Sequence, residues 1–143
     1  MSLTIELPLP PRALSSNGSH GHWSGHARAE AAYRDECRLW AMAQISPVRR
    51  SEPPERAYVA YEVCTKHGRA AAPLTWQQGR RTVSSPRYQP RDQSNALAAL
   101  KAAQDALVDS GAIKDDSQKH MILAGITISG LEGPYVRVRV TPC

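Results

Sequence analysis

The chain has 143 residues, enough for one domain with a modest hydrophobic core. Its net charge is +5 and most of its 18 basic residues are arginine, whose planar guanidinium suits phosphate, so the composition favours a nucleic-acid partner over a surface that is basic for solubility alone. No apolar run approaches the roughly 20 residues that span a bilayer, and the N-terminus does not resemble a signal peptide, so we expect a cytoplasmic protein without membrane association.

The three cysteines are odd in number and widely spaced, at Cys37, Cys64 and Cys143. This spacing predicts reduced thiols rather than a disulfide framework or a zinc site. At the N-terminus, apolar residues alternate with polar ones from Leu3 to Leu9 and predict a half-buried strand, which the following prolines end.

Residues 13–26 are rich in serine, glycine and histidine and predict a loop. Its histidines have no acids or cysteines nearby, so a solvated or phosphate-facing loop is favoured over a metal site. Apolar residues at three- and four-residue spacing then predict a helix from Ala27 to Gln44. The expected buried stripe consists of Ala29, Tyr33, Cys37, Trp40 and Ala41.

Proline content predicts a loop over residues 46–54, and alternation predicts a strand from Ala57 to Thr65. No acid lies between Glu62 and Asp92, a segment that contains several arginines and two aromatic residues. We interpret this segment as a loop that becomes ordered on DNA, with arginines on phosphates and an aromatic ring available for stacking. The expected phosphate contacts are Arg80, Arg81, Arg87 and Arg91. A solvated basic loop without a fixed role is the alternative.

A second helix is expected from Asn95 to Ser110, with Leu97, Leu100, Gln104 and Leu107 on or near one stripe and Gly111 at its end. Residues 119–129 predict a strand with His120, Ile122, Ala124, Ile126 and Ile128 on one face. Residues 135–141 predict the last strand, with its valines inward and its arginines outward. Two main helices and about four strands indicate a single small mixed α/β (α+β) domain over residues 1–143.

Five acids lie in the window from Arg91 to Gln118, although the chain as a whole is basic. They lie at both ends of the expected helix, as Asp92 before it and as Asp115 and Asp116 after it. A hard cation such as Mg²⁺ takes oxygen ligands of this kind, usually one or two carboxylates together with substrate phosphate. Lys101 and Asp105 are four residues apart, and a simple surface ion pair is the alternative for this lysine.

The order of residues in this window resembles the RusA family of Holliday-junction resolvases. The resemblance is carried by Asp92-x-x-Asn95, by Lys101 with the helix end Asp105-Ala-Leu-Val-Asp-Ser-Gly111, and by Asp115-Asp116-Ser-Gln. Near the N-terminus, Leu7-Pro-Leu-Pro-Pro11, Ser16-Asn17 and His22-Trp23 resemble the opening strand and loop of the family. Ser94 stands where the family has a second aspartate.

The resemblance implies a RusA-like fold and a Mg²⁺-dependent endodeoxyribonuclease that resolves four-way DNA junctions by paired symmetric nicks in recombination and repair. It implies a homodimer. The implied catalytic residues are Asp92, Lys101 and Asp116, and the implied Mg²⁺ ligands are Asp92, Asp115 and Asp116. Asn17, His22 and Asn95 would lie near the DNA.

Two alternatives stay open. One is a RusA-like protein that binds branched DNA without cleaving it. The serine at position 94, where the family has an aspartate, favours this alternative to the nuclease. The other is a basic structural or partner-binding domain with an incidental acidic patch. Metal-dependent nicking separates the nuclease from both, and salt-sensitive DNA binding separates the two alternatives from each other.

Overall fold

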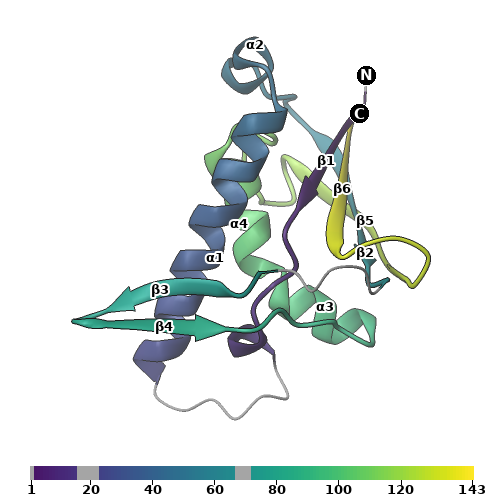
Figure 1. Ribbon diagram of the computed structural model, residues 1–143. Helices are drawn as coiled ribbons and strands as arrows, with labels where there is room; N and C mark the ends of the chain where they lie inside the picture. Colours follow the sequence, from purple (N-terminus) through teal and green to yellow (C-terminus); the bar gives the residue numbers. More distant parts are fainter. Residues whose placement is uncertain (1, 16–22, 67–71) are drawn as a thin grey trace.

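The computed structural model describes residues 2–15, 23–66 and 72–143. Its elements are β1 (Leu3–Leu7), the 3-10 turn η1 (Arg12–Leu14), α1 (Trp23–Gln44), α2 (Pro47–Ser51), β2 (Ala57–Cys64), β3 (Leu74–Gln78), β4 (Arg81–Ser85), α3 (Gln93–Ala99), α4 (Lys101–Asp109), β5 (Met121–Ser129) and β6 (Tyr135–Pro142). A four-stranded sheet lies on one side of the molecule, α1 and α4 lie on the other, and the β3–β4 hairpin projects away from the sheet (Figure 1). The expected α+β class with a mixed four-stranded sheet is confirmed.

The strands of the main sheet lie in the order β1-β6-β2-β5. The central strand β6 is antiparallel to both of its neighbours, whereas β2 and β5 are parallel. Val136, Val138 and Val140 of β6 are fully buried, and Arg139 between them is exposed. The sheet therefore has one covered face and one open face, and this is why alternation in the sequence predicted β6 and β2 well.

The covered face of the sheet packs against α1 and α4. Ala29, Tyr33, Cys37 and Ala41 of α1 are fully buried, as their spacing predicted. Trp40 was expected in the same stripe, but 45% of its surface is exposed. The buried positions recur at every fourth residue, which is slightly more than one helical turn of 3.6 residues. The buried stripe therefore moves around the helix, and Trp40 lies beside it rather than on it. The buried hydroxyl of Tyr33 donates a hydrogen bond to the carbonyl of Pro8 at 2.7 Å.

α1 begins at Trp23, inside the expected loop of residues 13–26. Two further segments that were expected to be loops also contain regular structure. Residues 47–51 form the short helix α2, because Ser46 caps its N-terminus by accepting from the amide of Arg49 at 3.3 Å and Pro47 fits the first helical position. Within the acid-free segment, β3 and β4 pair as an antiparallel hairpin whose turn contains Gly79 at φ +67°. The expectation of a continuous loop was therefore wrong in both places.

The expected helix from Asn95 to Ser110 is divided into α3 and α4. Leu100 separates them with φ −90° and ψ 3°, and it is buried. Leu97 was expected on the buried stripe, yet it is 43% exposed because the break changes the direction of the chain before α4 begins.

A bulge in β5 overturns the expected face of that strand. Val59 pairs with Leu123 and Ala60 with Gly125, so Ala124 is an additional residue on β5. One additional residue moves every later side chain to the opposite face. Ile122 and Ile126 therefore lie on opposite faces of the sheet, and Ile126 packs against the core.

Gly111 follows α4 and contacts α2. Its φ is +80°, and a Cβ at this position would lie 2.5 Å from the carbonyl oxygen of Arg50. Gly79, at φ +67°, has no atom within 4 Å of the corresponding position. Both glycines have a positive φ, which is unfavourable for residues with a Cβ. Of the two, only Gly111 would also bring a Cβ into steric conflict with another part of the chain.

We predict that Gly111→Ala lowers the free energy of unfolding by at least about 2 kcal/mol more than Gly79→Ala, which should cost about 1 kcal/mol. Urea denaturation of both variants and the parent protein measures the difference. Equal losses in the two variants would show that α2 does not constrain the position after α4.

Candidate functional site

Asp92 caps the N-terminus of α3 and orders its first turn. Its Oδ1 accepts from the backbone amide of Asn95 at 2.8 Å, and its Oδ2 accepts from the side-chain amide of Asn95 at 2.7 Å. An aspartate in this position satisfies an amide that has no partner inside the helix. Asn95 therefore holds the carboxylate of Asp92 in place. Ser94, in the same turn, is exposed.

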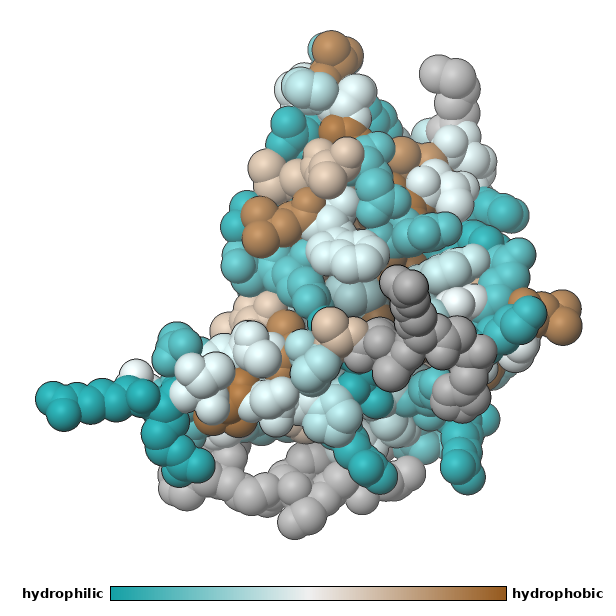
Figure 2. Space-filling model, in the orientation of Figure 1, coloured by the Kyte–Doolittle hydropathy of each residue, from teal (hydrophilic) through white to brown (hydrophobic). Residues whose placement is uncertain are grey.

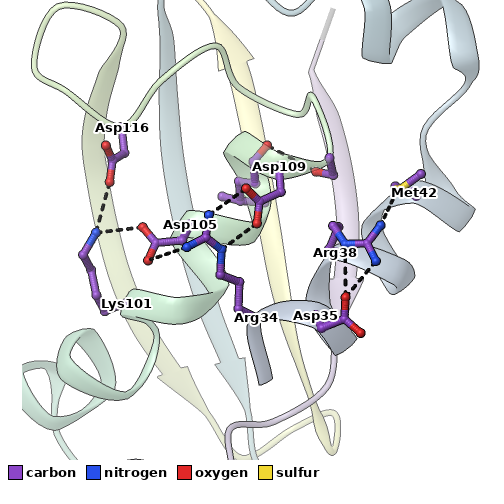
Figure 3. A network of polar contacts seen from close by, with 10 residues as sticks. Arg34, Asp35, Arg38, Met42, Lys101, Asp105, Asp109 and Asp116 are labelled. Carbon is purple, nitrogen blue, oxygen red and sulfur yellow. Dashed lines mark hydrogen bonds and ion pairs between the residues drawn. The ribbon is translucent and has the colours of Figure 1, made fainter. Parts of the chain in front are cut away.

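Lys101 is the first residue of α4, immediately after the break at Leu100. A positive charge at a helix N-terminus is unfavourable because it faces the positive end of the helix dipole. Two carboxylates offset it: Nζ of Lys101 lies 2.9 Å from Oδ1 of Asp105 and 3.1 Å from Oδ2 of Asp116 (Figure 3). Lys101 at the start of α4 therefore contacts both an acid of its own helix, Asp105, and an acid of the loop that follows α4, Asp116.

Asp116 accepts from two side chains. Besides Lys101, Nε2 of Gln104 lies 3.4 Å from its Oδ2. The hydrogen bond from Lys101 lowers the pKa of the Asp116 carboxyl below its ordinary value, and the hydrogen bond to Asp105 raises the pKa of Lys101. Both groups are charged at neutral pH, and a fixed ammonium lies between two acids at the surface.

Arg34 extends this network to α1. Its guanidinium binds Asp109 through two hydrogen bonds of 2.6 and 2.8 Å, and it lies 4.0 Å from Asp105 (Figure 3). Sequence reasoning missed Arg34, Gln104 and Asp109 as members of the cluster. It noted Asp105 only as a surface partner of Lys101, and that contact is present. The four-residue spacing was visible in the sequence, but the approach of Arg34 depends on how α1 packs against α4.

The expected Mg²⁺ ligands have suitable chemistry, but they are not gathered at one point. All three are aspartates, which offer the oxygen atoms that Mg²⁺ prefers. Asp116 is bound to Lys101, Asp92 is bound to Asn95, and Asp115 accepts from the amide of Asp116 at 2.8 Å. Among the described residues, these three do not form a group with ligand atoms within 4.8 Å of one another.

The described part of the chain contains one group of three metal-ligating side chains at such distances, Glu62, Cys64 and Glu132. Arg137 neutralises both carboxylates, because its guanidinium lies 3.4 Å from Glu62 and also binds Glu132. Burial raises the pKa of the Cys64 thiol to about 11, so this sulfur is protonated at neutral pH. The group is therefore an ion-pair cluster on the sheet, and it does not suggest a Mg²⁺ site.

The arginines expected to contact DNA lie in different environments. Arg80 and Arg81 are exposed at the tip of the β3–β4 hairpin, which forms a hydrophilic projection (Figure 2), and Arg91 is exposed next to Asp92. Asn17 and His22 lie outside the described residues. The aromatic Trp76 of β3 is partly buried and packs against the core, so it is less available for stacking than the sequence suggested.

Arg87 differs from the other arginines because only 10% of its side chain is exposed. Its guanidinium binds both carboxylate oxygens of Glu36, at 2.8 and 2.7 Å, and donates to the carbonyls of Leu9 and Ala72. These bonds occupy four of its five N–H donors, so we remove Arg87 from the set of expected DNA contacts. The sequence could not show this, because Glu36 is 51 residues away.

No family model matches the chain, and a search of curated proteins found no match. Among the described residues, no helix has both the length and the apolar character that crossing a membrane requires.

We predict that Lys101→Met raises the pKa of Asp116 towards the ordinary aspartate value, because the donor that lowers it is removed. In the parent protein the pair between Lys101 and Asp116 stabilises the folded state at pH values above the ordinary aspartate pKa. This stabilisation is lost as the pH falls through the lower pKa that Asp116 has in the folded protein. Carboxyl ¹³C NMR between about pH 2 and pH 6 measures both proteins.

Lys114→Met is the matched control. Lys114 binds Glu55 at 2.6 Å and lowers its pKa, so this variant should raise the pKa of Glu55 and leave Asp116 unchanged. An Asp116 that titrates alike in the parent protein and in Lys101→Met would contradict the contact between them.

Proposed function

We propose that the protein is an endodeoxyribonuclease of the RusA type, acting with Mg²⁺ to resolve four-way DNA junctions during recombination and repair in the cytoplasm. The observation that carries the proposal is the meeting of Lys101 and Asp116 at 3.1 Å. These residues are 15 positions apart, and both belong to the window that resembles the family. A lysine and an acid in contact at the surface supply the charges that phosphodiester hydrolysis uses.

Each residue has a proposed part in the reaction. Asp92, Asp115 and Asp116 would hold Mg²⁺, which when bound lowers the pKa of water and offsets charge on the phosphate. Lys101 would supply a fixed positive charge to the scissile phosphate, while Asp105 limits the positions its ammonium can take. Asn95 keeps the carboxylate of Asp92 oriented by two hydrogen bonds.

The exposed arginines of the hairpin support binding to a nucleic-acid backbone. Arg80 and Arg81 lie at the tip of the projecting β3–β4 hairpin (Figure 1), and Arg91 directly precedes Asp92 in the chain. Such residues neutralise phosphates without reading bases, and this suits a protein that recognises the shape of a junction. A homodimer would match the two-fold symmetry of the junction and bring one site to each of two opposing strands.

A second candidate is a protein that binds branched DNA without cleaving it. Two observations favour it: Ser94 offers a neutral hydroxyl where the family has a carboxylate, and the three expected ligands are bound to other groups rather than to a common point. The basic hairpin serves this function equally well.

We predict that the protein nicks a mobile four-way junction in the presence of Mg²⁺ and does not nick it in EDTA. Asp92→Asn and Asp116→Asn should each abolish nicking and leave junction binding intact or tighter, because a negative charge near phosphate is removed. Gel analysis of a labelled junction measures both properties.

Asp35→Asn is the control for this assay, since Asp35 pairs only with Arg38 on the surface of α1 among the described residues. Full nicking by both Asp92→Asn and Asp116→Asn would refute the assignment of the site. Salt-sensitive junction binding without nicking in any divalent cation would select the second candidate instead.

We predict that Arg80→Gln combined with Arg81→Gln weakens binding to duplex arms and reduces its salt dependence. Each lost phosphate contact should lower the slope of log K against log salt by about 0.9. The double variant Arg38→Gln and Arg139→Gln removes the same charge away from the hairpin and is the control. An unchanged slope in the hairpin variant would mean that the tip does not contact the backbone.

A further inference from the structure

An open hollow of about 370 Å³ lies between α2 and the C-terminal end of α4. Its apolar wall consists of Met42, Pro53, Val108 and Ile113. Its polar lining includes Arg50, Asp109, Ser110 and Lys114. The volume is within the range of small-ligand sites, and the mixture of an apolar wall with a few polar groups is typical of them.

Arg50 is the charge in this hollow that has no partner among the described residues. Its Nε is buried and has no hydrogen-bond acceptor in that part of the chain. None of the ion pairs among the described residues includes its guanidinium. A buried donor without an acceptor is costly and is rare in folded proteins. The guanidinium of Arg50 therefore has a requirement for an acceptor that the described part of the chain does not meet.

The charged groups next to Arg50 already have hydrogen-bond partners. Asp109 gives both carboxylate oxygens to Arg34, at 2.6 and 2.8 Å. Arg49, next to Arg50, donates to the carbonyls of Gly111 and Ala112 at 3.2 and 2.9 Å and so fixes α2 against the end of α4. These contacts hold α2, and with it the backbone of Arg50, against the end of α4.

The charge in the hollow indicates the class of ligand. Arg50 and Lys114 are positive, and Lys114 pairs with Glu55, whose side chain is 72% exposed. A guanidinium binds phosphate or carboxylate through parallel hydrogen bonds. A phosphomonoester carries about −1.5 to −2 charges at neutral pH and matches two cations better than a carboxylate does.

We infer that the hollow between α2 and α4 is a binding site for a phosphate group, in which Arg50 binds the phosphate and the apolar wall contacts the organic part of the ligand. The phosphate could belong to a small phosphomonoester or to the phosphodiester backbone of a nucleic acid. This inference does not depend on cleavage, because it rests on Arg50 and Lys114 at the opposite end of α4 from Lys101. The two places share Asp109, whose carboxylate is bound to Arg34.

The test follows the Nε–H signal of Arg50 in ¹⁵N NMR spectra while phenyl phosphate is added, with the signal assigned from the Arg50→Lys variant. We expect the signal to shift with saturation. Arg50→Ala lacks this signal, so its binding is followed through the backbone amide signals of the residues that line the hollow, as is that of the parent protein. It should bind phenyl phosphate about tenfold more weakly or worse, because a charge-assisted hydrogen bond is lost. Arg139→Ala removes the same charge from the open face of the sheet and should leave binding unchanged. Backbone amide spectra establish that each variant is folded.

Three further ligands define the chemistry. Benzoate has a similar shape but a single charge, so it should bind several-fold more weakly than phenyl phosphate. Inorganic phosphate lacks a group for the apolar wall and should also bind more weakly. A dithymidine phosphodiester without terminal phosphates separates the two sources, since tighter binding of this compound would assign the site to a nucleic-acid backbone.

Two outcomes would overturn the inference. One is equal binding of phenyl phosphate to the parent protein and Arg50→Ala. The other is binding of benzoate as tight as that of phenyl phosphate, which would show that the hollow does not recognise phosphate.

Discussion

The ion pair between Arg87 and Glu36 is the contact on which the arrangement of the N-terminal half depends. Arg87 lies after β4 and Glu36 lies on α1, and the same guanidinium binds the carbonyls of Leu9 and Ala72. One side chain therefore joins the end of β1, the middle of α1 and both ends of the hairpin segment. Because it is largely buried, leaving either partner alone would be costly. The pair fixes where the hairpin leaves the body of the protein.

This constraint links the hairpin to the acidic window. The chain passes from Arg87 to Asp92 in a few residues, so the base of the hairpin and the start of α3 are held near each other. The exposed tip of the hairpin, with Arg80 and Arg81, then projects from an anchored base (Figure 1). An anchored basic projection of this kind suits the binding of a phosphate backbone, and this supports the proposed function.

The position of Lys101 depends on the helix break at Leu100 between α3 and α4. A continuous helix through Leu100 would have kept Lys101 in the middle of a helix, facing mainly its own turn. The break makes Lys101 the first residue of α4, where its ammonium reaches Asp116 as well as Asp105. The cost of a lysine at a helix N-terminus is offset by the two acids. The same helix ends at Asp109, and Gly111 after it contacts α2 at Arg50, beside the hollow for which we infer phosphate binding.

The sequence by itself determined the α+β class, the long helix α1 and the strands β1, β2 and β6, and it offered the contact between Lys101 and Asp105 as an alternative. These features depend on local periodicity, because a helix or a strand with one covered face repeats its apolar residues at a fixed spacing. Only the tertiary structure decided the pairing of β3 with β4, the bulge at Ala124, the structural role of Arg87 and the meeting of Lys101 with Asp116. Each of these depends on residues far apart in the chain, whose distance is set by packing and not by spacing.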